Sequence, residues 1–152
     1  MNVPMDIPMN SSMNFPAQEA RARFERSPSA TLGTADAAAR PHLVPVTYVL
    51  ADDDHVYIAI DDKPKRSTDL RRLRNIAANP QVSLLVNEYA EDWSQLWWAR
   101  ADGTAVVAGF EELPDGLLAA FQTRYPWYCA NPPAGPVIDI CVTNWSGWAF
   151  TP

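Results

Sequence analysis

Residues that build metal and disulfide sites are scarce in this sequence. Its 152 residues include two cysteines and two histidines. His42 and His55 are isolated, and neither stands at ligand spacing from cysteines or carboxylates, so no metal site is predicted. Cys129 and Cys141 show no CxxC spacing. They are either buried small side chains in a reducing cytoplasm or partners in one disulfide, and the absence of an export signal favours the first alternative.

Several familiar sequence patterns are also missing. No GxGxxG, P-loop, GxSxG or HExxH motif occurs, so any nucleotide-like cofactor must bind through a fold that does not use them. No apolar run approaches the roughly 18 residues that a membrane span requires. The first residues lack the basic and apolar regions of a signal peptide. We therefore expect a cytoplasmic protein with no membrane partner.

Positive charge is scarce overall but concentrated locally. The chain has 12 basic and 18 acidic residues, for a formal net charge of -6, which argues against nucleic-acid binding because that requires a broad basic surface. Half of the basic residues nevertheless fall in one stretch, which contains Lys63, Lys65, Arg66, Arg71, Arg72 and Arg74. Basic side chains beside a helix N-terminus often bind phosphate or carboxylate groups. The stretch is either such an anion site or the solvated face of an Arg-rich helix.

The composition predicts one globular domain after a short extension. The chain is 47% hydrophobic and 20% charged, as is usual for globular proteins. All four methionines fall in residues 1–13, where Pro4 and Pro8 also interrupt the chain. We expect residues 1–13 to be a disordered extension and residues 14–152 to form a single domain.

Three helices are predicted from periodicity and capping signals. The first covers residues 16–26, with Asn14 as its cap. The second runs from a cap at Ser67 or Thr68 to the Asn-Pro pair that ends it, and its apolar face consists of Leu70, Leu73, Ile76 and Ala77. The third covers residues 111–125.

The other segments have the pattern of β-strands joined by short turns. Pro45 interrupts one long strand and marks a sheet edge or a bulge. A hairpin is expected to turn at residues 101–103. The predicted strands cover residues 30–34, 42–50, 56–60, 81–89, 96–103, 104–110, 137–143 and 145–151. Many short strands with few helices predict a mainly β, α+β protein built on a small antiparallel barrel.

Aromatic residues are abundant for a chain of this length. Most of them are expected to pack in the core or at an interface, and the set consists of Trp93, Trp97, Trp98, Trp127, Tyr128, Trp145 and Trp148. Adjacent residues on a strand point to opposite faces. One of Trp97 and Trp98 is therefore expected in the core and the other at a groove or a partner subunit.

The order of these elements resembles a known family. The segments PHLVPV, VYIAI, KPKRSTDLRRLRNIAANPQVSLLV and LWWARADGTA are similar to those of the pyridoxamine-5′-phosphate-oxidase-like split-barrel family. Within it, the sequence looks most like the actinobacterial flavin/deazaflavin oxidoreductases that depend on coenzyme F420. The resemblance covers about Pro16 to Phe150. It implies an antiparallel six- or seven-stranded split β-barrel with flanking helices, which forms a homodimer with two cofactors in grooves between the subunits.

The resemblance also implies which residues bind the cofactor. The loop and helix start after the VYIAI strand would hold its phosphate, two neighbouring strands would lie along its ring, and a tryptophan pair would reach the cofactor of the other subunit. The expected set is Pro45, Val46, Thr47, Ile58, Ala59, Ile60, Lys63, Lys65, Arg66, Ser67, Thr68, Arg72, Trp97 and Trp98. No catalytic residue and no metal ligand is assigned.

Coenzyme F420 is the cofactor that the resemblance favours. Flavin oxidases of the wider family usually carry a second Arg/Lys pair on the strand that here reads PHLVPVTYV, whereas this chain has only Arg40 at its edge. The implied function is an oxidoreductase that uses F420 to transfer a hydride to an unidentified small organic substrate. The alternatives are an FMN-dependent oxidoreductase of the pyridoxamine-phosphate-oxidase type and a non-catalytic flavin- or tetrapyrrole-binding protein.

Overall fold

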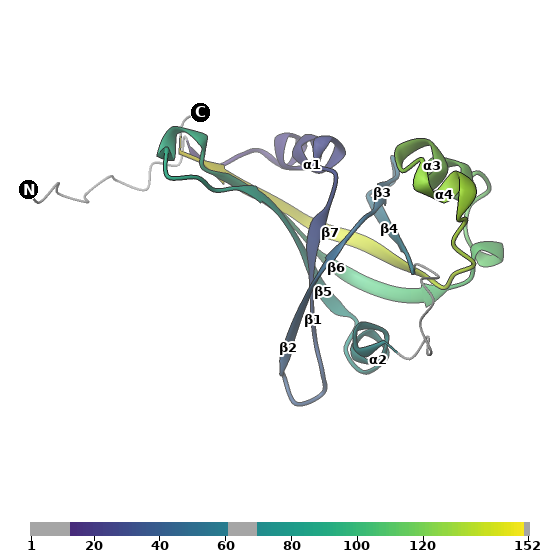
Figure 1. Ribbon diagram of the computed structural model, residues 1–152. Helices are drawn as coiled ribbons and strands as arrows, with labels where there is room; N and C mark the ends of the chain where they lie inside the picture. Colours follow the sequence, from purple (N-terminus) through teal and green to yellow (C-terminus); the bar gives the residue numbers. More distant parts are fainter. Residues whose placement is uncertain (1–12, 61–69, 151–152) are drawn as a thin grey trace, which may run out of the picture.

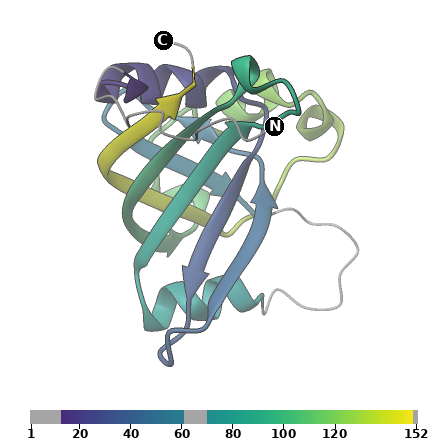
Figure 2. The same ribbon diagram turned by 90° about the vertical axis from the view of Figure 1, so that its left-hand side faces the viewer.

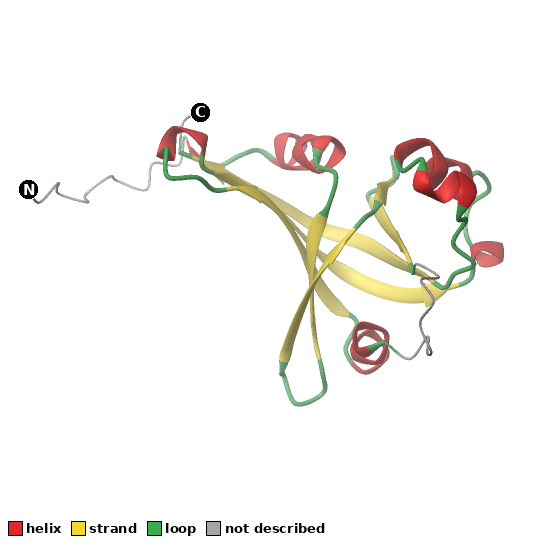
Figure 3. Ribbon diagram, viewed as in Figure 1, coloured by secondary structure: helices red, strands yellow, loops and turns green. Residues whose placement is uncertain are grey.

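A curved antiparallel sheet with helices around it forms the body of the protein (Figures 1 and 3). The computed structural model describes residues 13–60 and 70–150. Within them, seven strands form one sheet in the order β2-β1-β5-β6-β7-β4-β3. The strands are β1 Ala30–Ala35, β2 Pro41–Val46, β3 Val49–Leu50, β4 His55–Ala59, β5 Gln81–Glu88, β6 Trp97–Ala108 and β7 Val137–Ala149. The predicted mainly β split-barrel class is confirmed, with seven strands rather than six.

The two edge strands of this sheet are neighbours in sequence. β2 and β3 lie at opposite ends of the strand order, and only Thr47 and Tyr48 separate them. The prediction of one continuous strand over residues 42–50 is therefore wrong. The backbone N–H of Tyr48 leaves the sheet ladder and donates to the hydroxyl of Tyr125 at 3.1 Å. Pro45 does lie on an edge strand, as predicted, where its missing N–H costs no ladder bond.

The two longest strands replace two expected strand pairs. β6 runs without interruption past the predicted turn at residues 101–103, and β7 runs past Asn144, where two separate strands were predicted to meet. Instead of a turn, the register between the strands shifts at Asp102 and Gly103, as in a β-bulge. Gly103 lies so close to the carbonyl of Cys141 that a Cβ atom would collide with it. The glycine thus allows close strand contact rather than chain reversal.

Two apolar clusters form the core. The larger one collects the inward-facing residues of the sheet together with Phe24, and its members include Leu32, Tyr48, Ile58, Leu84 and Ile140. In β5, Val82, Leu84 and Val86 are buried at every second position, as predicted. A smaller cluster lies where two helices cover β4, and it consists of Tyr57, Ala59, Leu117, Phe121, Tyr128 and Val137.

The first helix matches its predicted extent but not its predicted cap. α1 spans Ala17–Arg26, and Pro16 is its N-cap without a side-chain bond. Asn14 instead forms an isolated β-bridge with Trp148 on β7. That bridge holds the chain against the sheet just before the helix begins, so Asn14 is too far from the helix to cap it.

The other helices differ more from expectation. α2 spans Arg71–Ala78 with Leu70 as its N-cap, so the predicted start at Ser67 or Thr68 is wrong. Its buried side chains are Asn75 and Ile76, whereas Ala77 is exposed. The expected helix over residues 111–125 is a short 3-10 helix, η3 Phe110–Glu112, followed by α3 Leu117–Arg124 after Gly116, which has a φ of 85°. A further 3-10 helix, η2 Trp93–Gln95, and α4 Trp127–Ala130 lie outside the predicted helices and strands.

Both cysteines are free and exposed. Neither alternative from the sequence therefore holds, because the thiols are neither buried nor joined in a disulfide. Cys141 lies on the outward-facing side of β7, between the buried residues Ile140 and Val142. Among the described helices, none is both long and apolar enough to cross a membrane.

Candidate functional site

The helix α2 packs against the sheet near the turn of the β1–β2 hairpin. It lies beside that end of the hairpin in both views (Figures 1 and 2). The side chain of Asn75 is buried, and its Nδ2 atom donates to the hydroxyl of Thr34 on β1 at 3.0 Å. Thr34 is buried as well. This polar pair fixes the helix against the inner face of the sheet.

Arg72 lies on the same helix face as Asn75. The two residues are three positions apart, so their side chains are neighbours on the helix surface. Arg72 is half-buried, and its Nε atom is fully buried without a hydrogen-bond partner among the described residues. Burial lowers the pKa of this guanidinium from its ordinary value. A buried, unpaired cationic donor is costly, so the position fits an anionic ligand.

The observed helix start changes which cations lie at its positive end. Because α2 begins at Arg71, both Arg71 and Arg72 occupy its first turn, and no acidic residue is present there. The partial positive charge of the helix N-terminus adds to theirs. Five further residues that were expected to bind phosphate lie outside the described residues, namely Lys63, Lys65, Arg66, Ser67 and Thr68.

The strand residues expected along the cofactor ring divide into two kinds. Pro45 is exposed on the sheet edge and Thr47 is half-buried. The other four side chains belong to the core, which leaves only their backbones for contact with a ligand, and they are Val46, Ile58, Ala59 and Ile60. The hydroxyl of Thr47 is 3.1 Å from the hydroxyl of Tyr128 on α4. The edge of β2 that faces away from β1 has no strand partner in the sheet.

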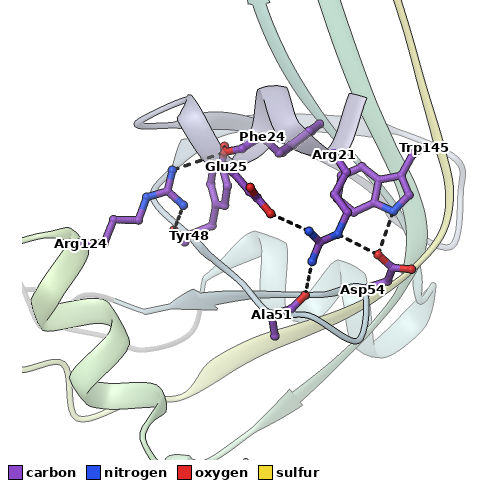
Figure 4. A network of polar contacts seen from close by, with 8 residues as sticks. All are labelled: Arg21, Phe24, Glu25, Tyr48, Ala51, Asp54, Arg124 and Trp145. Atoms are coloured by element: carbon purple, nitrogen blue, oxygen red, sulfur yellow. Dashed lines mark hydrogen bonds and ion pairs between the residues drawn. The ribbon is translucent and has the colours of Figure 1, made fainter. Parts of the chain in front are cut away.

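A network around Arg124 holds the crossing between β2 and β3. Its guanidinium donates to the carbonyl of Tyr48 at 2.9 Å and to the carbonyl of Ser27. It also stacks on the Tyr48 ring, 4.6 Å from the centroid. The Tyr48 hydroxyl donates to the carbonyl of Phe24 at 2.6 Å, and burial raises the pKa of Tyr48 to about 12. Figure 4 shows how Arg124 thereby joins α3 to the end of α1 and to the crossing.

A second arginine ties the acidic turn between β3 and β4 to α1. Arg21 donates to the Asp54 carboxylate at 3.1 Å and to the carbonyl of Ala51 at 2.7 Å (Figure 4). The indole N–H of Trp145 donates to the same carboxylate at 3.3 Å. Sequence reasoning missed both arginine networks, because their partners are far apart in the chain and no motif marks them.

Trp97 and Trp98 lie on opposite faces of β6, as predicted. Trp97 packs against the main core, and the guanidinium of Arg23 lies 4.7 Å from its ring. Trp98 shares the outer face with Arg100, whose guanidinium lies 5.5 Å from the Trp98 ring. Of the pair, Trp97 belongs to the core side of the strand and Trp98 to the outer face.

The outer face of β2, β1, β5 and β6 combines apolar and charged side chains. Strand register places Leu43, Leu85 and Arg100 on this face. Leu43 is 70% exposed and Leu85 is 38% exposed. Arg100 donates to the Asp102 carboxylate at 3.0 Å, and Ser83 donates to it at 2.5 Å. The face therefore combines exposed apolar side chains with an ion pair between Arg100 and Asp102.

A histidine–carboxylate pair joins β4 to β7. The Nδ1 atom of His55 is 2.5 Å from a carboxylate oxygen of Asp139, and this hydrogen bond raises the pKa of His55 above its ordinary value. Tyr57 stacks on the imidazole with a ring separation of 5.8 Å. No group of three or more His, Cys, Asp or Glu residues that could hold a metal ion occurs within the described ranges.

Solved structures share this fold at low sequence identity. A FAD-binding protein from Mesorhizobium loti is 21% identical, with a TM-score of 0.60 over 88% of this chain and 94% of that one. The heme storage protein HutZ from Vibrio cholerae is 17% identical, with a TM-score of 0.64 over 87% and 92%. A conserved protein of unknown function from Corynebacterium diphtheriae is 20% identical, with a TM-score of 0.64 over 91% and 97%.

Sequence comparison identifies the family. No curated protein matches the chain. The family model described as pyridoxamine 5′-phosphate oxidase matches residues 16–148, which include the whole described sheet except Ala149, the last residue of β7. Because that match extends over most of the chain, the protein belongs to the pyridoxamine 5′-phosphate oxidase family.

Proposed function

We propose that this protein is an oxidoreductase that uses a phosphate-bearing flavin-type cofactor, and that coenzyme F420 is this cofactor rather than FMN. The observation that carries the proposal is the half-buried guanidinium of Arg72, whose Nε has no partner among the described residues. It stands in the first turn of α2, where the helix dipole also favours an anion. Membership of the pyridoxamine 5′-phosphate oxidase family supports a cofactor of this class.

The chain's own groups would bind and orient the cofactor. Arg72 pairs with its phosphate, and the unpaired edge of β2 offers backbone groups to the ring. The Thr47–Tyr128 hydroxyl pair, 3.1 Å apart, fixes the chain beside that edge. When bound, F420 supplies hydride transfer from its deazaflavin ring. The substrate is accordingly a small organic molecule with an electron-poor double bond or ring.

The choice of F420 over FMN rests on the charges that β2 presents. Arg40, the basic residue immediately before β2, has 74% of its side chain exposed and pairs with Asp36 at 2.7 Å. It is thus engaged at the hairpin tip and does not supplement Arg72. FMN oxidases of the family usually have further cations on this strand, as the sequence resemblance implies. The cations of α2, together with Lys63, Lys65 and Arg66 in the sequence before it, suit F420 with its acidic tail.

The outer face of the sheet is the proposed dimer interface. Leu43 and Leu85 give it an exposed apolar surface, and the paired Arg100 and Asp102 carry no net charge across it. A second copy on this face would bring Trp98 toward the cofactor of its partner. We therefore expect a homodimer, which the mass of the protein in solution will reveal.

Cofactor titration of the purified protein tests the proposal. The visible absorbance spectrum first shows whether a flavin or a heme is bound. Fluorescence titration with F420 and FMN then gives both affinities, for the natural protein and for Arg72→Met. Loss of one charge-assisted hydrogen bond predicts that the variant binds F420 about tenfold more weakly or worse.

Arg26→Met is the matched control, because it removes the same charge from an exposed position on α1. It should leave F420 affinity unchanged. Tight FMN binding without F420 binding would replace F420 by FMN in the proposal. A bound heme, without F420 or FMN binding, would support a carrier instead of an oxidoreductase. Equal F420 affinity of Arg72→Met and the natural protein would overturn the anion site.

A further inference from the structure

Two buried nitrogen atoms without partners lie at the junction of α2 and the β1–β2 hairpin. One is Nε of Arg72, and the other is Nδ1 of His42 on β2. Neither atom has a hydrogen-bond partner in the part of the chain that the structure describes. Among buried polar atoms such cases are rare, because leaving one unpaired costs free energy.

Strand register and one hydrogen bond bring these two atoms to the same junction. His42 is the cross-strand partner of Thr34, so both side chains lie on the inner face of the sheet. Thr34 accepts a hydrogen bond from Asn75 of α2 at 3.0 Å. Arg72 precedes Asn75 by three residues and shares its helix face. His42 therefore faces the junction from the strand side, and Arg72 faces it from the helix side.

An oxyanion is the ligand that satisfies both atoms. Arg72 can only donate, and it carries a positive charge. His42 Nδ1 can donate when that nitrogen is protonated. A phosphate group offers several acceptor oxygens and can bind both donors at once. Asp36, the acidic residue at the tip of the same hairpin, is already bound to Arg40 at 2.7 Å and does not serve as the partner.

We propose that His42 and Arg72 together bind a phosphate group, His42 from β2 and Arg72 from α2. This inference rests on the proposed function, because we assign that phosphate group to the cofactor. His42 is thus the strand-side ligand in a chain whose β2 presents no Lys or Arg to the helix. It holds the phosphate by a hydrogen bond from Nδ1 rather than by a fixed charge.

The proposed contact requires a hydrogen-bond donor at the Nδ1 position of His42. The side-chain amide of Asn places its nitrogen near the Nδ1 position of His, whereas that of Gln reaches the Nε2 position. His42→Asn should therefore retain phosphate binding, and His42→Gln and His42→Phe should lose it. Each of the last two variants should weaken F420 binding about tenfold or more. If FMN is the cofactor, the same loss applies to FMN.

Two measurements on the full chain test this inference. Fluorescence titration with F420 and FMN compares the natural protein with the His42 variants, and His55→Asn serves as a control on β4, away from α2. Nitrogen-15 NMR of the histidine rings is then recorded during titration with inorganic phosphate. The ring signals of His42 should shift with phosphate, whereas those of His55 should not. If His42→Phe does not fold, the Asn and Gln variants carry the comparison.

The outcomes separate this inference from the proposed function. If His42→Gln binds the cofactor as tightly as the natural protein while Arg72→Met does not, His42 is not a ligand and the proposed function stands. If neither F420 nor FMN binds but inorganic phosphate shifts the His42 ring signals, the proposed function fails and the phosphate site stands. If phosphate leaves those signals unchanged and no His42 variant alters affinity, the phosphate site is overturned.

Discussion

Replacing Arg124 with methionine should destabilise the protein by about 2–3 kcal/mol. Methionine keeps most of the aliphatic length but removes the guanidinium that donates to the carbonyls of Tyr48 and Ser27. Hydrogen bonds from a charged donor contribute about 1.5–3 kcal/mol each, and stacking on the Tyr48 ring adds about 0.5–1 kcal/mol. A hydroxyl group stays within hydrogen-bond distance of each carbonyl, that of Tyr125 at 3.0 Å from the Tyr48 carbonyl and that of Tyr48 at 3.1 Å from the Ser27 carbonyl, and the Tyr48 hydroxyl shares its one proton with the Phe24 carbonyl. The expected loss therefore lies below the sum of these terms.

Urea unfolding followed by tryptophan fluorescence measures this loss at a fixed protein concentration, because dimerisation would make stability depend on concentration. Arg26→Met is the control. That side chain is 62% exposed and makes one ion pair at 3.5 Å, so its loss should cost less than about 0.5 kcal/mol. If Arg124→Met costs no more than the control, the Arg124 network does not stabilise the crossing between β2 and β3.

A second substitution tests whether the network acts as a unit. Tyr48→Phe removes the hydroxyl that shares the carbonyls of Phe24 and Ser27 with Arg124. In the double variant these carbonyls lose both side-chain donors. The combined cost should exceed the sum of the single costs by about 1 kcal/mol. Simple additivity would show that the two side chains stabilise the protein independently.

Two further predictions concern the sheet. The hydrogen bond to Asp139 raises the pKa of His55. Its contribution to the free energy of unfolding is therefore complete below the unfolded-state pKa of about 6.5, and that contribution is lost as the pH rises through the folded-state pKa. Unfolding free energy should fall over that range in the natural protein but not in Asp139→Asn, and parallel pH profiles would contradict this. Gly103→Ala should cost about 1–3 kcal/mol because its Cβ meets the Cys141 carbonyl. A Cβ at Gly33 would meet the flexible Leu43 side chain at 3.3 Å and the Ser83 carbonyl oxygen at 3.6 Å, an ordinary contact distance. Gly33→Ala should therefore cost less in the same urea assay, and equal costs would refute the steric explanation.

Sequence reasoning succeeded where the pattern is local. The alternation of Val82, Leu84 and Val86 placed one face of β5 in the core, and Pro45 marked an edge strand. The first helix and most strand positions followed from the same kind of signal. These features depend on neighbouring residues, whose periodicity directly reflects which side of an element is buried.

Sequence reasoning failed where a local signal has two structural meanings. Asp102-Gly103 is typical of a hairpin turn, but the same pair also suits a bulge in a continuous strand. Which one forms depends on β7, which lies alongside β6 and continues past the glycine. Likewise, nothing near Tyr48 in sequence indicates that the strand ends there, because its partner Tyr125 is 77 residues away.

The candidate site was predictable only in part. Clustered charge pointed to the region of Arg72, but its missing partner is a property of the folded interface and not of the sequence. His42 was set aside as a metal ligand because it is isolated in the sequence, and no spacing rule marks a strand histidine as a phosphate ligand. The sequence did contain one signal for His42. It is a polar residue at an inward-facing position of a strand, and the other inward-facing residues of that strand, Val44 and Val46, are apolar.

The short crossing between the two edge strands also determines how the barrel can open. Val46 and Val49 are three residues apart, so their Cα atoms cannot separate by more than about 11 Å. The chain itself therefore keeps the two edge strands close together at this end of the sheet. The opposite end of β2, where His42 lies, has no such tether. Any widening that admits a ligand must therefore pivot on the crossing and be largest at the junction with the helix.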